Sequence, residues 1–195
     1  MLCKMISLRD YIQSNRPFTV RGGQKDRILI FDIDDTILKS NATVDVYKND
    51  KVVRQLSSSE FNTYKLKPGE QFDFTSFNSA ESLITAELLP YWNTLVREYK
   101  KGTHVGIITA RSDKYAIQKF LLYNNIDIKE PLIIAVNDKH SYYYGNVAER
   151  KRQAIEELIH VGYNTFVFFD DNTDNLRYAK SLEKDYDIKV KTIKA

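Results

Sequence analysis

The residues best suited to do chemistry are three aspartates that directly follow an apolar run. Residues 28–31, ILIF, precede Asp32, Asp34 and Asp35. A continuous β-branched and aromatic run is typical of a strand buried on both faces of a parallel sheet, and open α/β sheets bind ligands at the carboxyl ends of their strands. Three carboxylates this close repel one another unless a cation lies among them. Mg²⁺ is the simplest candidate, because it prefers carboxylate and phosphate oxygens.

Two later segments repeat this arrangement of an apolar run followed by polar residues. Residues 104–108 precede the tripeptide TAR at 109–111, and residues 166–169 precede Asp170 and Asp171. Because the carboxyl ends of parallel strands share one edge of the sheet, these polar groups are expected near the first aspartates.

A basic cluster lies between these two segments, at the start of a predicted helix. Arg150, Lys151 and Arg152 stand in succession ahead of an apolar stripe. The phase of that helix favours Lys151 as the residue that faces the site, with Arg150 as the alternative.

Residues 32–36, DIDDT, resemble the DxDxT signature of the haloacid dehalogenase superfamily, and the other three segments follow in that family's order. The resemblance covers residues 27–38 and 89–193. It is closest in pattern to the phosphatase domain of polynucleotide kinase-phosphatases and to small viral and RNA-repair members. Position 35 holds aspartate where many members have glycine.

The resemblance and the needs of phosphoryl transfer imply roles for these residues. Asp32 would be the nucleophile that forms an aspartyl-phosphate, and Asp34 would act as general acid and then base. The acid at this second position is what the family's phosphatases carry and its dehalogenase branch lacks. Thr109 would hydrogen-bond the phosphoryl group, and Lys151 would neutralise it and steady Asp32.

The same resemblance implies a Mg²⁺ site made by Asp32, Asp170 and the backbone carbonyl of Asp34. Asp171 and Asp174 are further candidates, either in direct contact or through water. The predicted site residues are Asp32, Asp34, Thr109 and Lys151 for catalysis, Asp32, Asp34, Asp170 and Asp171 for the metal, and Thr36, Ala110, Arg111, Tyr142 and Tyr143 for the substrate.

The prediction of a substrate class rests on a loop rich in tyrosine. Residues 137–146 read NDKHSYYYGN, with Tyr142, Tyr143 and Tyr144 shortly before the basic cluster. At the rim of the crevice these rings could stack a base, while Lys139 or Arg111 meets a second phosphate. This predicts a nucleotide or a nucleic-acid end as substrate, rather than another small phosphate ester. The alternative is that the tyrosines pack beneath a cap.

The chain of 195 residues allows one α/β domain with an insertion. Strands alternating with helices after residue 88 predict a doubly wound parallel sheet, the Rossmann-like core that the resemblance also implies. Residues 39–87 show short alternating runs, including a hairpin over 43–53, and predict a small β-rich cap insertion. The core would then comprise residues 1–38 and 88–195, with a short helix at 7–14.

Composition excludes several other classes of protein. Apolar residues make up 43% of the chain and charged residues 28%, as is ordinary for a globular domain. No apolar run approaches the ~20 residues of a membrane span, and the amino terminus lacks the apolar region of a secretory signal. The single cysteine, Cys3, excludes an internal disulfide. These features predict a cytoplasmic protein with no membrane partner, and they leave its oligomeric state open.

Two other functions use similar residues. A phospho-receiver domain needs its phosphorylated aspartate on a middle strand, whereas Asp32 opens the series here. A metal-dependent nuclease or a non-catalytic nucleic-acid-binding module would use Arg111, Lys114, Arg150 and Arg152 as phosphate contacts. The net charge of +3 is too small to argue a nucleic-acid partner by itself.

Overall fold

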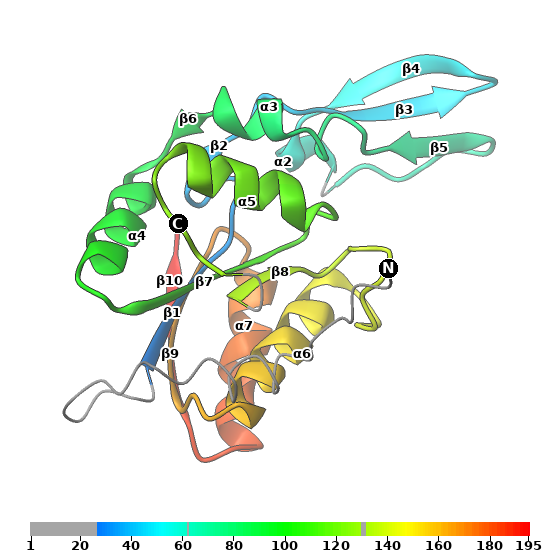
Figure 1. Cartoon of the computed structure of the whole chain (residues 1–195). Coiled ribbons are helices and arrows are strands. Elements are labelled where there is room, and N and C mark those ends of the chain that lie inside the picture. Colours follow the sequence, from blue (N-terminus) through cyan, green and yellow to red (C-terminus); the bar gives the residue numbers. More distant parts are fainter. Residues whose placement is uncertain (1–26, 62, 130–131) are drawn as a thin grey trace, which may run out of the picture.

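The computed structural model describes residues 27–61, 63–129 and 132–195, which form a five-stranded parallel sheet flanked by helices and a smaller antiparallel sheet (Figure 1). The parallel sheet has the order β10-β9-β1-β7-β8, and every neighbouring pair in it is parallel. The predicted α/β class is therefore confirmed, whereas the helix predicted at 7–14 lies outside the described residues. The strands are β1 (Arg27–Phe31), β7 (His104–Thr109), β8 (Ile133–Ala135), β9 (Thr165–Asp170) and β10 (Lys189–Lys194).

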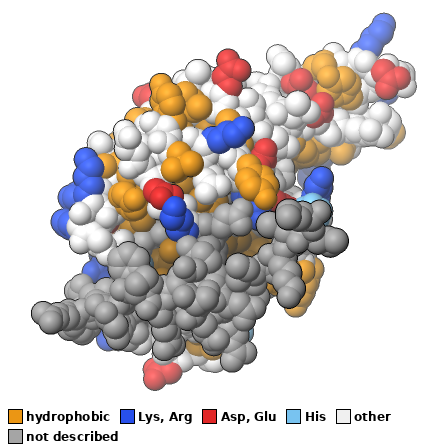
Figure 2. Space-filling view, in the orientation of Figure 1, with side chains coloured by type: hydrophobic (Ala, Val, Ile, Leu, Met, Phe, Trp, Pro, Cys, Tyr) orange, Lys and Arg blue, Asp and Glu red, His pale blue; other side chains and the backbone are white. Residues whose placement is uncertain are grey.

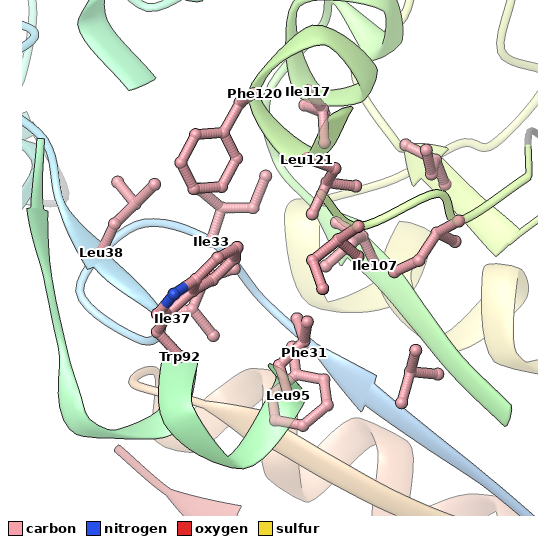
Figure 3. Close-up of a cluster of buried hydrophobic side chains, with 14 of the residues drawn as sticks. Phe31, Ile33, Ile37, Leu38, Trp92, Leu95, Ile107, Ile117, Phe120 and Leu121 are labelled. Carbon is pink, nitrogen blue, oxygen red and sulfur yellow. The ribbon is translucent and has the colours of Figure 1, made fainter. Parts of the chain in front are cut away.

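Alternate residues of β1 pack in two separate hydrophobic cores, because successive side chains of a strand point to opposite faces of the sheet. Leu29 and Phe31 belong to one buried cluster, and Ile28 and Ile30 belong to the other. Figure 3 shows the first cluster, in which Phe31 lies with Trp92, Leu95 and Ile107.

Each cluster is covered by its own pair of helices. The cluster around Phe31 is covered by α4 (Pro90–Lys100) and α5 (Lys114–Tyr123), and the other by α6 (Val147–His160) and α7 (Thr173–Ser181). The sheet is thus buried on both faces, which explains why its strands are apolar runs and do not alternate. In the described ranges, no helix has both the length and the apolar character needed to cross a bilayer.

The central strand β1 is where the sheet changes its direction of growth. After β1 the chain adds β7 and β8 on one side, and it then crosses to add β9 and β10 on the other. The crevice at the carboxyl ends of strands flanking such a switch point is where open α/β sheets bind ligands. This topology brings the ends of β1, β7 and β9 together.

The insertion leaves and rejoins the core through two short paired strands, β2 (Leu38–Lys39) and β6 (Glu87–Leu88). Its own sheet has the order β4-β3-β5 and comprises β3 (Val44–Lys48), β4 (Lys51–Leu56) and β5 (Glu70–Asp73). This sheet projects from the body of the molecule, and Figure 2 shows both charged and hydrophobic side chains on it.

The predicted hairpin within the insertion is present as β3 and β4. Its turn residues Asn49 and Asp50 have φ values of 49° and 59°. Positive φ at both central turn positions matches the twist of the flanking strands, and asparagine and aspartate tolerate it.

Three short elements complete the insertion. The helix α2 (Ser58–Phe61) begins at the capping box formed by Ser57 and Glu60, as the sequence SSSE at residues 57–60 predicts, whereas β5 and the helix α3 (Ala80–Ile84) were not predicted. Both of the latter are too short for hydrophobic periodicity to detect. Leu83 of α3 is fully buried in the core cluster around Phe31, so the end of the insertion packs on the core.

Candidate active site

Three strand ends place polar side chains at one edge of the parallel sheet. Asp32 directly follows β1, and its backbone N–H donates to the carbonyl of Phe169 in β9 at 2.9 Å. Thr109 is the last residue of β7, and Asp170 is the last residue of β9. All three polar side chains are buried. The segments identified in the sequence therefore meet as expected from a parallel sheet.

Lys151 lies between the two strand-end carboxylates. Its Nζ is 2.9 Å from Asp32 Oδ1 and 2.8 Å from Asp170 Oδ2. The lysine is 1% exposed, so this ion-paired group is cut off from solvent. Arg150 instead donates to the side chain of Asn137 and to the carbonyl of Gly145. Of the two alternatives, Lys151 is thus the residue that contacts Asp32.

The start of α6 fixes this helix phase. Asn146 accepts a hydrogen bond from the backbone N–H of Glu149, and the Glu149 side chain accepts one from the backbone N–H of Asn146. This reciprocal capping box anchors the first turn. Lys151 and Ala154 are then directed inward along with the apolar residues of the helix.

Burial and the neighbouring charges have opposite effects on the pKa values of Asp32 and Lys151. Burial raises the pKa of Asp32, since it disfavours the carboxylate, while the positive charge of Lys151 opposes that rise. Burial alone would lower the pKa of Lys151, but the charges of Asp32 and Asp170 outweigh it and raise that pKa. Two carboxylates facing one ammonium leave an excess of negative charge in a buried place.

This excess of negative charge fits a divalent cation. Asp32, Asp170 and Asp171 each offer an oxygen, and these atoms lie within 4.8 Å of one another. Asp32 Oδ1 is buried and forms an ion pair with Lys151. Among the described residues it accepts no hydrogen bond of good geometry. Burial together with the charge of Asp170 raises the pKa of Asp171 to about 6. A buried set of carboxylate oxygens is the donor chemistry that Mg²⁺ prefers.

The carboxylates of Asp34 and Asp174 lie outside this oxygen cluster. Asp174 has a side chain 69% exposed and pairs with Arg177 at 3.0 Å on the surface of α7. The side chain of Asp34 pairs with Arg111, and the contact of its backbone carbonyl with Mg²⁺ stays a prediction. Of the two further candidates named from sequence, Asp171 belongs to the cluster and Asp174 does not.

Asp170 is held in place by a residue that the sequence analysis missed. Its Oδ1 accepts from Asn175 Nδ2 at 2.9 Å and from the Asn172 backbone N–H at 2.8 Å. Asn175 is buried and also lines the cavity described below. The available signal was an asparagine on the inward face of the helix that follows the last acidic pair.

The predicted general acid, Asp34, forms a bidentate ion pair with Arg111. Nε and Nη2 of Arg111 donate to the two carboxylate oxygens of Asp34, both at 2.8 Å. Nη1 donates to the backbone carbonyl of Phe77, and the guanidinium lies 5.1 Å from the centre of the Phe77 ring. Because Phe77 belongs to the insertion, Arg111 joins the candidate acid to the insertion. The sequence predicts a substrate contact for Arg111 but does not predict this pairing.

The backbone conformation of Asp35 explains why glycine is common at this position in the family that the sequence resembles. Its φ is 56°, in the left-handed region that favours glycine. Aspartate is among the few other residues that adopt this conformation readily. The tight turn from β1 into the insertion is therefore compatible with the DxDDT form.

A cavity of about 710 Å³ opens between this edge of the sheet and the insertion. Its walls combine predicted catalytic groups with aromatic side chains that the sequence analysis did not assign to the site. The core contributes residues including Asp32, Asp34, Thr109, Ala110, Arg111, Arg150, Lys151 and Asp171, and the insertion contributes Val44, Phe61, Phe74, Phe77 and Asn78.

Three residues predicted to touch substrate lie elsewhere. Thr36 is 1% exposed and is absent from the cavity wall. Tyr142 is 75% exposed, and Tyr143 donates to Glu157 of α6 at 2.7 Å while its ring packs against the core. The tyrosine loop folds back along α6, so neither ring reaches the cavity.

No protein-family model, curated protein or solved structure matches this chain.

Proposed function

We propose that this protein is a magnesium-dependent phosphomonoesterase of the haloacid dehalogenase type, acting through an aspartyl-phosphate on Asp32. The observation that carries the proposal is the buried cluster in which Lys151 contacts both Asp32 and Asp170 beside a cavity. Phosphoryl transfer needs a nucleophile, an acid for the leaving group and positive charge around the phosphoryl oxygens, and this edge of the sheet supplies all three. The strand order and the β-rich insertion are consistent with the family resemblance.

In the first step, an oxygen of Asp32 attacks phosphorus and the bond to the alcohol oxygen breaks, with its electron pair leaving on that oxygen. Asp34 supplies the proton that the departing alcohol needs. In the second step, Asp34 takes a proton from water, whose oxygen attacks the aspartyl-phosphate, so that phosphate leaves and Asp32 is regenerated. Phosphomonoester and water are thus converted to alcohol and inorganic phosphate.

Asp32, Asp170 and Asp171 would hold Mg²⁺, which when bound neutralises charge on the phosphoryl oxygens and on the carboxylates. Lys151 would hold Asp32 in place and Thr109 would donate a hydrogen bond to the phosphoryl group. Both side chains are buried, Thr109 at the end of β7 and Lys151 in α6, so they are already oriented before the reaction begins.

Arg111 pairs with the residue proposed as the general acid. Both oxygens of Asp34 accept a hydrogen bond from Arg111 in this structure, and each oxygen keeps a second lone pair that could accept a proton. A dianionic phosphoryl group is a competing partner for the planar guanidinium fork. Binding of substrate would therefore draw Arg111 toward the phosphoryl oxygens and away from Asp34.

Two of the four basic residues that the nucleic-acid-binding alternative would use are paired with carboxylates within the protein. Arg111 is 4% exposed and occupied by Asp34, and Arg152 pairs with Glu156 and Asp185. These side chains do not present a free basic surface for phosphates along a strand. The single cysteine remains our reason to place the protein in the reducing cytoplasm.

The test is release of phosphate from a panel of nucleoside monophosphates, 3′- and 5′-phosphorylated oligonucleotides and sugar phosphates, with Mg²⁺ and with excess chelator. Asp32→Asn preserves shape but removes the nucleophile, so we expect turnover to fall to background. Asp127→Asn is a matched control, because Asp127 is a surface residue paired with Lys129. Undiminished turnover in Asp32→Asn, or in chelator, would exclude this mechanism.

A further inference from the structure

The insertion turns three phenylalanines toward the reaction cavity. Phe61, Phe74 and Phe77 all line it, together with Asp32 and Lys151 from the core. Single exposed apolar residues are ordinary on protein surfaces. An aromatic wall opposite a set of catalytic charges is a different arrangement, since one cavity then offers both an apolar and an ionic surface.

This aromatic wall is anchored from behind. Phe61 and Phe77 pack against the small buried cluster of the insertion sheet formed by Val44, Val46 and Leu56. Phe74 is not part of that cluster and remains 40% exposed. Its ring lies edge-on to Phe61, with centroids 5.3 Å apart and planes at 86°. The insertion sheet thus fixes the position of the aromatic wall, and the ring of Phe74 remains accessible to a ligand.

The ring of Phe77 is already in contact with Arg111. The guanidinium of Arg111 lies 5.1 Å from the centre of its ring, within the range of a cation–π contact. The aromatic surface available to a ligand is therefore that of Phe61 and Phe74.

The cavity is larger than a phosphoryl group alone requires. Its volume of about 710 Å³ lies within the roughly 300–1,000 Å³ of small-molecule sites. Polar side chains also line it beyond the reaction centre, among them Asn78, Ser112 and Asn137. A sugar phosphate could use these polar groups, but it would leave the phenylalanines facing water. A flat ring with polar edges would use both kinds of surface.

We propose, resting on the function proposed above, that the substrate is a phosphomonoester whose alcohol carries a nucleobase, with the base packed on Phe61 and Phe74 and the phosphoryl group at Asp32 and Lys151. Every nucleobase has a π-face, so stacking on an aromatic side chain does not depend on which base is present. The insertion then selects the substrate, while the core performs the chemistry. The aromatic contact predicted for the tyrosine loop is supplied instead by these phenylalanines.

The test measures binding as well as turnover. Asp32→Asn protein in Mg²⁺ buffer is titrated by calorimetry with a nucleoside 5′-monophosphate, with ribose 5-phosphate and with O-phosphotyrosine. We expect the nucleotide to bind most tightly. Adding Phe74→Ala should weaken nucleotide binding by about 5- to 150-fold, the range measured for loss of one base–aromatic stack, and should change ribose 5-phosphate binding less than about twofold.

Two further variants separate a stacking contact from loss of structure. Phe74→Leu keeps apolar bulk without a ring, so it should lie between wild type and Phe74→Ala. Tyr142→Ala removes an aromatic residue that is 75% exposed and absent from the cavity wall, and it should leave nucleotide binding unchanged. Equal weakening of both ribose-containing ligands by Phe74→Ala would overturn the inference, as would a preference for phosphotyrosine.

Failure of this inference and failure of the proposed function give different results. If the wild-type enzyme hydrolyses ribose 5-phosphate as well as the nucleotide and binds both equally, the phosphatase stands and the base site is wrong. If no ester is hydrolysed, the phosphatase proposal fails, and the binding preference still decides whether Phe61 and Phe74 form a base site.

Discussion

Replacing Lys151 by methionine tests whether the buried charges at the sheet edge form one unit. Methionine retains a similar unbranched side chain but removes the ammonium that lies 2.9 Å from Asp32 and 2.8 Å from Asp170. Both carboxylates are almost fully buried, so they would face each other without a cation. Removing one partner from a buried ion pair typically costs about 3–5 kcal/mol.

The expected change in melting temperature follows from that range. For a chain of this size, each kcal/mol shifts the midpoint by about 2–4 °C, so the Lys151→Met protein should melt about 6–20 °C lower in chelator. The matched control is Lys101→Met, whose lysine pairs with Glu98 at 3.0 Å but is 59% exposed. Such a surface pair contributes about 0–1 kcal/mol, and its loss should move the midpoint by only a few degrees.

Two further measurements of the Lys151→Met protein test the same idea, one with added Mg²⁺ and one with a second substitution. The Lys151→Met protein keeps the oxygen cluster of Asp32, Asp170 and Asp171 but lacks a competing cation, so Mg²⁺ should stabilise it more than it stabilises wild type. Adding Asp32→Asn should recover part of the lost stability in chelator, because one of the two facing charges is then gone. The measurement is thermal unfolding followed by circular dichroism, with and without Mg²⁺.

The reasoning would be refuted by a Lys151→Met protein that melts within a few degrees of Lys101→Met. It would also be refuted if the added Asp32→Asn change lowered stability further. Either result would mean that Asp32 and Asp170 do not rely on Lys151 for compensation.

Two other predictions concern proton transfer and stability. Asp34→Asn should lower turnover by about 10²- to 10⁴-fold on esters with poor leaving groups and far less on p-nitrophenyl phosphate, because it leaves the nucleophile and removes the acid; equal losses on both would contradict that role. Burial raises the pKa of Glu157 to about 7 from its ordinary 4.5, so the folded state favours its protonated form. This contribution to stability is complete below about pH 4.5 and is lost as pH rises through about 7. Denaturant titrations between these pH values should therefore show wild type losing stability relative to Glu157→Gln, and a constant difference would contradict the assignment.

The local pattern of the sequence determined the class of fold and the segments that make the site. The run before Asp32 is apolar on both faces, which only a doubly covered strand requires, and alternation of strands with helices leads to a parallel sheet. Parallel strands bring their carboxyl ends to one edge, so Asp32, Thr109 and Asp170 could be placed together without knowledge of any contact. These inferences depend on periodicity and connection, which are properties of neighbouring residues.

Tertiary packing decided which side chains contact one another at that edge. Arg150 and Lys151 are adjacent in sequence and both positively charged, but the capped first turn of α6 directs only the lysine between the carboxylates. The pairing of Arg111 with Asp34 joins residues 77 positions apart, and no local pattern encodes it. Such contacts follow from how helices and the insertion settle on the sheet.

The aromatic part of the cavity shows the same division. Both the tyrosines near residue 143 and the phenylalanines of the insertion were visible in the sequence, and both lie in segments without strong periodicity. A loop before a helix can fold over the crevice or back along that helix, and burial of Tyr143 beside Glu157 selects the second course. The insertion rejoins the core through β2 and β6, which brings Phe61 and Phe74 over the strand ends. The periodic elements can be predicted because their hydrophobic pattern is a property of neighbouring residues, whereas the direction of irregular segments depends on surfaces that exist only once the core has formed.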